Sequence, residues 1–135
     1  MTDRGKYDFD FTGKIILVVE DNQISFKLIS AVLSKVRIGV VHASTGRKAI
    51  QTCESMQPLD LVLMDLQLPE VNGLEATRQI KKIRPDLPVI ATTANTYDED
   101  KQACMDAGCS AYISKPLQFK KLFELMQSFL DQGKQ

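Results

Sequence analysis

The chain has 135 residues, enough to bury the core of one domain. Its 17 basic and 17 acidic residues balance and are interspersed, so no basic surface favours nucleic acid or an anionic membrane. No apolar run approaches the roughly 20 residues that span a bilayer. Cys53, Cys104 and Cys109 form no C-x-x-C pair, which is typical of apolar fillers in a reducing compartment. We expect a cytoplasmic domain that contacts neither nucleic acid nor membrane.

From residue 14 onward, short apolar runs alternate with segments of helical periodicity. The runs predict strands that are buried on both faces. They cover residues 14–19, 38–43, 61–64, 88–93 and 111–114. Apolar residues at the spacing of one helix face follow each run. These faces hold Ile24, Leu28, Ile29, Val32, Leu33 and Val36 in the first helix, and Leu74, Thr77, Ile80 and Ile83 in the third.

Several short signals mark the ends of the predicted helices. Asn72 and Gly73 turn the chain into the third helix, and Pro85 ends it. Residues 96–99 match a capping box at the start of the fourth helix, which Gly108 closes. The helix boundaries therefore fall between the predicted strands.

A strand followed by a helix, five times over, demands parallel strands joined by right-handed crossovers. The fold class expected from this order is an α/β three-layer sandwich with a five-stranded parallel sheet and five helices. We interpret residues 1–13 as a leader or linker, residues 14–131 as the domain and residues 132–135 as a C-terminal tail.

Polar and charged residues gather where the predicted strands end. The carboxyl ends of parallel strands meet at one edge of a sheet, where ligands bind in open α/β folds. This edge should carry Glu20, Asp21, Asp65, Thr93 and Lys115. Two like charges about 4 Å apart repel by roughly 4 kcal/mol at an effective dielectric near 20. Because a divalent cation offsets this repulsion, and because an oxygen-only ligand set suits Mg²⁺, we expect a magnesium site.

Five segments, taken in order, resemble the receiver domain of two-component response regulators. They are residues 18–22 (VVEDN), 63–69 (LMDLQLP), 72–78 (NGLEATR), 93–95 (TAN) and 114–116 (SKP). The resemblance covers residues 14 to about 131 and implies a flavodoxin-like fold with strand order 2-1-3-4-5. The motifs look most like receivers attached to hybrid sensor histidine kinases, in which residues 1–13 would be the end of the linker from the kinase.

This resemblance implies that the domain is a phosphoacceptor. Asp65 would attack the phosphorus of a phosphohistidine on a histidine kinase or a histidine phosphotransfer protein, and would become an aspartyl phosphate. Asp21 and Asp65 would hold Mg²⁺ together with the backbone carbonyl of Gln67. Glu20 would act on the ion through a water molecule.

The resemblance also implies roles for residues at the ends of the fourth and fifth strands. Lys115 would pair with one phosphoryl oxygen, the Thr93 hydroxyl would donate to another, and the amide of Ala94 would help. Pro116 would follow a cis peptide bond. Because Thr93 and Tyr112 lie on adjacent strands, we expect Tyr112 to move inward when Thr93 moves toward the phosphoryl group.

Three other functions remain open. A flavin-binding electron carrier of the same fold would need a phosphate-cradling loop after the first strand, where Glu20 and Asp21 would repel phosphate. A phosphohydrolase with an Asp nucleophile would carry a D-x-D pattern instead of two adjacent acids. A degenerate receiver would act only as a docking module.

Two further features bear on partners. His42, the only histidine, is expected to be a structural residue rather than a phosphodonor. Residues 109–111 are Cys-Ser-Ala, whereas DNA-binding relatives often carry acidic residues there for a symmetric dimer face. We therefore expect a monomer.

Overall fold

The structure, a computed structural model, describes residues 9–55, 58–94 and 98–130. Within these ranges, five strands alternate with five helices. In chain order they are β1 (Ile15–Val19), α1 (Gln23–Ser34), β2 (Gly39–Ala43), α2 (Gly46–Ser55), β3 (Leu61–Asp65), α3 (Gly73–Ile83), β4 (Val89–Thr93), α4 (Asp98–Ala107), β5 (Ala111–Ser114) and α5 (Phe119–Leu130). No helix in the described part of the chain is long and apolar enough to cross a membrane.

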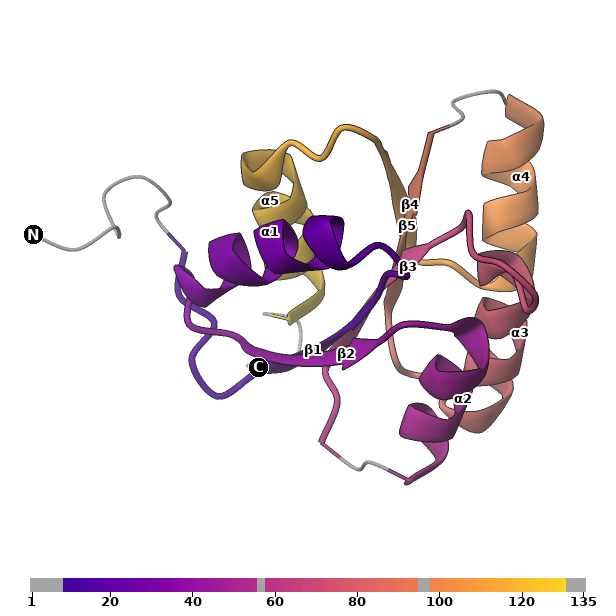
Figure 1. Cartoon of the computed structure of the whole chain (residues 1–135), viewed down its shortest axis with the longest axis horizontal. Helices are drawn as coiled ribbons and strands as arrows, with labels where there is room; N and C mark the ends of the chain where they lie inside the picture. Colours follow the sequence, from indigo (N-terminus) through magenta and orange to yellow (C-terminus); the bar gives the residue numbers. More distant parts are fainter. Residues whose placement is uncertain (1–8, 56–57, 95–97, 131–135) are drawn as a thin grey trace, which may run out of the picture.

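The strands form one parallel sheet in the order β2-β1-β3-β4-β5. This confirms the predicted fold class and strand order. Helices α1 and α5 cover one face of the sheet, and α2, α3 and α4 cover the other (Figure 1). Val19 pairs with Met64, and Asp65 pairs with Thr92. The carboxyl ends of the central strands are therefore level, and the loops that follow them share one edge.

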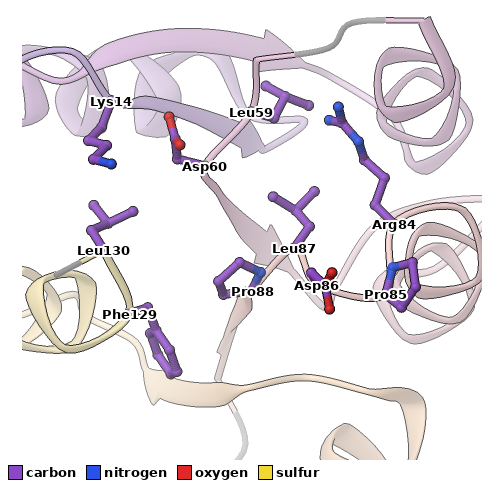
Figure 2. Close-up of a pocket in the computed structure, with 10 residues that line it drawn as sticks. All are labelled: Lys14, Leu59, Asp60, Arg84, Pro85, Asp86, Leu87, Pro88, Phe129 and Leu130. Atoms are coloured by element: carbon purple, nitrogen blue, oxygen red, sulfur yellow. The ribbon is translucent and has the colours of Figure 1, made fainter. Parts of the chain in front are cut away.

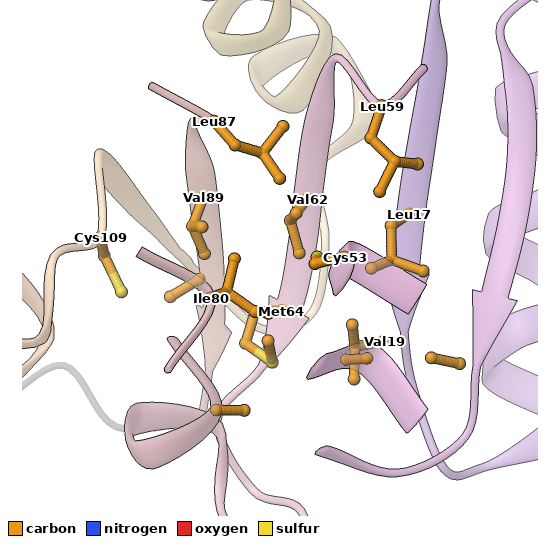
Figure 3. Packing of buried hydrophobic residues seen from close by; sticks show 14 of the residues in the cluster. Leu17, Val19, Cys53, Leu59, Val62, Met64, Ile80, Leu87, Val89 and Cys109 are labelled. Carbon is orange, nitrogen blue, oxygen red and sulfur yellow. The ribbon is translucent and has the colours of Figure 1, made fainter. Parts of the chain in front are cut away.

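Each face of the sheet carries its own apolar core. Successive strand residues point to opposite faces, so β1 sends Leu17 and Val19 into one core and Ile16 and Val18 into the other. In the first core, strand residues of β1, β3 and β4 pack with Cys53 of α2 (Figure 3). The second core is closed by α1 and α5. Apolar strands with both faces covered explain why the sequence shows continuous apolar runs.

The packed domain begins before residue 14. Phe11 is 4% exposed, and its N–H donates to the carbonyl oxygen of Val36 at 2.8 Å. Val36, predicted to lie on the first helix, is buried but follows the end of α1 at Ser34. The rings of Phe9 and Phe11 lie 5.6 and 6.5 Å from that of Phe123 on α5. The end of the segment that we interpreted as a leader is thus part of the second core.

The apolar stripe of α1 is only partly buried. Ile29 and Leu33 face the core, whereas Ile24 is 81% exposed and Leu28 is 59% exposed. The six positions predicted to share one helix face are therefore not all buried, because these two residues are exposed. The stripe is wider than the surface that the sheet and α5 cover, so its outer edge faces solvent. Likewise, Ile83 in the last turn of α3 was predicted to be inward and is 37% exposed.

The structure confirms the predicted start and end of α3 and the predicted end of α4. Oδ1 of Asn72 accepts a hydrogen bond from the Glu75 N–H at 3.0 Å and caps α3. A Cβ on Gly73 would lie 2.5 Å from the carbonyl oxygen of Asp65, so a glycine is needed for α3 to begin so close to β3. Gly108, with φ of +106°, follows α4. The capping box predicted at residues 96–99 lies outside the described side chains.

Candidate functional site

Three carboxylates meet at the carboxyl ends of β1 and β3. One oxygen from each of Glu20, Asp21 and Asp65 lies within 4.8 Å of the others. Glu20 and Asp65 are buried, and Asp21 is exposed. The cluster arises because β1 and β3 are neighbours in register, β3 ends in Asp65, and Glu20 and Asp21 directly follow β1. The structure thus brings together the three acids that the sequence placed at this edge.

Glu20 is held by the backbone around it. Its N–H donates to the carbonyl oxygen of Ala43 at the end of β2 (3.1 Å), and its Oε2 accepts from the Asn22 N–H (3.1 Å). Burial raises the pKa of the Glu20 carboxyl, and the nearby Asp65 and Asp21 carboxylates raise it further. The Asn22 hydrogen bond and the charge of Lys115 act in the opposite direction. The raised pKa shows that this acid is costly to ionise without an added cation.

Two donors, an ammonium group and a backbone N–H, contact the same carboxylate oxygen of Asp65. The Nζ of Lys115 lies 3.1 Å from Oδ1 of Asp65, and the Gln67 N–H donates to the same oxygen at 2.9 Å. Lys115 is positioned by its own backbone, because its N–H donates to the carbonyl oxygen of Thr93 at 2.8 Å. The Lys115–Pro116 peptide bond is cis. The loops after β3 and β5 therefore converge on a single carboxylate.

Gln67 lies in the loop between β3 and α3, and its side chain reaches the end of β4. Its Nε2 donates to Oγ1 of Thr93, and its Oε1 accepts from the Ala94 N–H, both at 3.3 Å. The sequence placed Thr93 and Ala94 at this edge, but it did not predict these two contacts of the Gln67 amide. A glutamine two residues after the acid was the available signal, since its amide can both donate and accept.

Tyr112 lies on the same face of the sheet as Thr93. It pairs with Ala91, and Thr93 pairs with Ser114, so side-chain alternation places both residues on one side. Tyr112 is half-buried against the first core. The Nζ of Lys101 lies 5.4 Å from the centre of its ring, within the range of a cation–π contact. No pattern in the sequence pointed to this lysine.

His42 supports the site from β2. Its Nε2 donates to the carbonyl oxygen of Glu20 at 2.8 Å, since that oxygen can only accept. Its ring stacks on Phe26 of α1, with ring centres 3.6 Å apart. The sequence predicted a structural role for His42 without identifying this contact. His42 thus connects α1 to the backbone of the acid cluster.

Two cavities lie at opposite ends of the sheet. One of about 260 Å³ borders the acid cluster and is lined by Glu20, Lys115 and Pro116 together with Leu28 of α1. Another of about 500 Å³ is lined by residues that precede β1, β3 and β4 and by the end of α5 (Figure 2). This larger cavity lies at the amino ends of the strands, away from the three clustered acids.

The donor set at the carboxyl edge fits Mg²⁺. Three carboxylates supply hard oxygen ligands, and an exposed Asp21 leaves one side open to the waters that Mg²⁺ retains. Burial and, to a smaller extent, the Asp65 and Asp21 carboxylates raise the pKa of Glu20, and a cation at this edge would favour its ionised form. Fold and site together define a flavodoxin-like α/β domain with an acidic centre contacted by a lysine.

Comparison with known proteins gives the family. The sequence profile of the response regulator receiver domain matches residues 16–127. The polar-differentiation response regulator DivK of Brucella ovis is 37% identical over 120 residues, which cover 87% of this chain and 96% of DivK. The chain therefore belongs to the response regulator receiver domain family and is a receiver domain of two-component signalling.

Solved structures agree in fold. The receiver domain of the sensor histidine kinase PA1611 from Pseudomonas aeruginosa, with a magnesium ion in its active-site cleft, is 34% identical, with a TM-score of 0.81 over 88% of this chain and 98% of that one. The receiver domain of Saccharomyces cerevisiae Ssk1, in complex with the histidine phosphotransfer protein Ypd1, is 28% identical, with a TM-score of 0.82 over 89% of this chain and 90% of that one.

Proposed function

We propose that Asp65 accepts a phosphoryl group from a phosphohistidine on a histidine kinase or a histidine phosphotransfer protein. The observation that carries this proposal is the position of Asp65 among two further acids, with Lys115 Nζ 3.1 Å from its carboxylate. A carboxylate oxygen of Asp65 attacks the phosphorus, and the P–N bond breaks with its electron pair going to the leaving imidazole. The product is an aspartyl phosphate.

Mg²⁺ is part of this proposal. Asp21 and Asp65 would hold it with the backbone carbonyl of Gln67, and Glu20 would reach it through a water molecule. When bound, the ion neutralises charge on the phosphoryl oxygens. PA1611, which is 34% identical to this chain, has magnesium in its active-site cleft, and this supports the assignment.

The chain's own donors complete the proposed site. Lys115 moves from the carboxylate of Asp65 to a phosphoryl oxygen, and the Thr93 hydroxyl and the Ala94 N–H donate to other phosphoryl oxygens. Such transfer depends on positioning and charge neutralisation more than on proton chemistry. Lys115 is suited to this movement because its side chain is a flexible stem that ends in a compact charge.

The exposed edge of α1 is proposed to bind the phosphodonor. Ile24 and Leu28 expose apolar surface, and Leu28 also lines the cavity that borders Glu20 and Lys115. A protein that carries phosphohistidine must place its side chain at Asp65 and would cover this edge. The complex of Ssk1 with the histidine phosphotransfer protein Ypd1 supports a partner of this kind.

We infer further that the domain acts in the cytoplasm as a monomer. Three free, buried cysteines agree with a reducing compartment. The domain would contact neither nucleic acid nor membrane.

A degenerate receiver that only docks is the alternative proposal. Incubation with acetyl phosphate and Mg²⁺ separates the two, with whole-protein mass as the readout. We expect a stoichiometric gain of one phosphoryl group in the wild type, which is lost with Asp65→Asn and with a chelator. A wild type that gains no mass with Mg²⁺ present would reject the phosphoacceptor proposal in favour of docking. A yellow, flavin-bearing protein would reject both.

A further inference from the structure

The amide of Gln67 is oriented by its two contacts. A backbone N–H can only donate, so the Ala94 N–H fixes Oε1 of Gln67 on its side at 3.3 Å. The Nε2 group then faces Oγ1 of Thr93, also at 3.3 Å. The Gln67 backbone N–H donates to Oδ1 of Asp65 at 2.9 Å. Gln67 thus links the proposed phosphoacceptor to both groups at the end of β4.

These two groups are also the proposed donors to the phosphoryl oxygens. In the unmodified domain the Ala94 N–H is satisfied by Gln67, and the Thr93 hydroxyl oxygen accepts from the Gln67 amide. A phosphoryl group on Asp65 would need the same Ala94 N–H, whereas the Thr93 hydroxyl can donate to a phosphoryl oxygen while it accepts from Gln67. The Gln67 amide oxygen and a phosphoryl oxygen therefore compete for the Ala94 N–H.

We propose that Gln67 is a positioning residue that occupies the phosphoryl-oxygen site in the unmodified domain and must withdraw before Asp65 can hold a phosphoryl group. The inference rests on the proposed function for the roles of Asp65, Thr93 and Ala94. It assigns to the side chain of Gln67 a role separate from that of its backbone carbonyl, which is a proposed metal ligand.

The physical basis is competition between acceptors. Oε1 of Gln67 is neutral, whereas a phosphoryl oxygen is charged and makes hydrogen bonds roughly twice as strong. The phosphoryl group therefore displaces the amide. Because only the withdrawn state can bind, the apparent affinity for a phosphoryl mimic is lowered by the fraction of molecules in that state. Gln67 is exposed, so the withdrawn side chain is accommodated by solvent.

Gln67→Met tests this proposal, because it keeps the length of the side chain and the backbone carbonyl but removes the amide. The measurement is the affinity for beryllofluoride, a phosphoryl mimic, at saturating Mg²⁺, followed through backbone amide NMR signals. We expect Gln67→Met to bind about threefold to tenfold more tightly, the effect of losing one typical net hydrogen bond. Gln51→Met, the same change at an exposed site on α2, should bind as the wild type does.

A second readout separates this role from a merely structural one. In the unmodified protein, Gln67→Met should move the Ala94 amide proton signal, and with beryllofluoride bound the two proteins should give the same Ala94 signal. In the wild type, beryllofluoride should move the side-chain NH₂ signals of Gln67. If the wild type binds beryllofluoride but Gln67→Met binds it equally or more weakly, the proposal for Gln67 is wrong and the phosphoacceptor site stands. If the wild type does not bind beryllofluoride at all, both are wrong.

Discussion

Asp65 ends β3 and Lys115 follows β5, two strands that are not neighbours, yet Lys115 Nζ lies 3.1 Å from Oδ1 of Asp65. β4 stands between their two strands, so the lysine reaches across the end of β4. The Asp65 side chain is 4% exposed and that of Lys115 is 34% exposed. This partial shielding makes the contact more than an ordinary surface ion pair. In the unmodified domain, the ammonium group of Lys115 therefore lies against the acid that we propose to be phosphorylated.

Lys115→Arg tests whether Lys115 is needed for the conformational response to phosphorylation in addition to supplying a positive charge. Arginine keeps the charge, but its planar guanidinium cannot act as a compact point donor. We expect phosphorylation by acetyl phosphate to slow by no more than about tenfold, which corresponds to a loss near 1.4 kcal/mol. The NMR change at Tyr112 on phosphorylation should be lost. Lys82→Arg, an exposed lysine on α3, is the control. An unchanged Tyr112 response in Lys115→Arg would contradict this role.

Tyr112 should report modification at a distance. It shares a sheet face with Thr93 and lies under Lys101, so a movement of Thr93 toward a phosphoryl group frees space beside its ring. We expect the Tyr112 ring signals in NMR spectra to shift on addition of beryllofluoride and Mg²⁺. The shift should vanish in Thr93→Ala. A Tyr112 environment that stays constant while Asp65 is demonstrably modified would leave the switch unsupported.

Repulsion within the acid cluster should limit stability when no metal is present. Asp21→Asn removes one of three neighbouring negative charges and keeps the shape of the side chain. In a chelator, we expect the melting midpoint to rise by about 3 °C, the size that follows from roughly 1 kcal/mol. Added Mg²⁺ should stabilise the wild type and not the variant. Asp86→Asn, at the other end of the sheet, should give no such rise. A lower midpoint for Asp21→Asn in chelator would count against cluster repulsion.

Because the thiol of Cys53 is buried, we expect the domain to lose stability at alkaline pH. Burial raises the pKa of its thiol from 9.0 to about 11, with the charge of Arg84 acting in the opposite direction. Between these values the native state keeps a proton that the unfolded chain loses, so the free energy of unfolding falls as pH rises. The expected contribution is on the order of 2 kcal/mol.

Urea unfolding at pH 8.5 and pH 10.5 measures this contribution, because pH 8.5 lies about half a unit below the thiol pKa of the unfolded chain and pH 10.5 about half a unit below that of the folded domain. Cys53→Ala should show a smaller drop between the two than the wild type does, whatever its stability at pH 8.5. Equal drops for both proteins would show that the Cys53 thiol does not titrate differently in the folded state.

The sequence predicted the acid cluster because its cause is topological. Parallel strands that end in Glu20 and Asp65 must bring these acids to one edge once the strand order is known. The exposure of Ile24 and Leu28 could not be predicted, since periodicity gives the width of an apolar stripe but not the width of its cover. The amide contacts of Gln67 depend on a loop conformation that no periodic pattern encodes.

The ends of the domain show a similar limit. Phe9 and Phe11 alternate with acids, a pattern shared by a short strand and a mobile segment, and only the packing on Phe123 decides the matter. By contrast, Gly108 after α4 was predictable, because a helix that ends in a left-handed residue favours glycine. The sequence therefore predicted local backbone features, but it did not predict the long-range packing of aromatic rings.

Asp65 is the acid that we propose to be phosphorylated. The most direct test is to phosphorylate the protein with acetyl phosphate and Mg²⁺, reduce the acyl phosphate with borohydride, and map the reduced residue by peptide mass spectrometry. We predict stoichiometric reduction at Asp65, with Asp65→Asn unlabelled and still folded. Stoichiometric labelling at another acid such as Asp21 or Glu20, or labelling that persists in Asp65→Asn, would contradict this account.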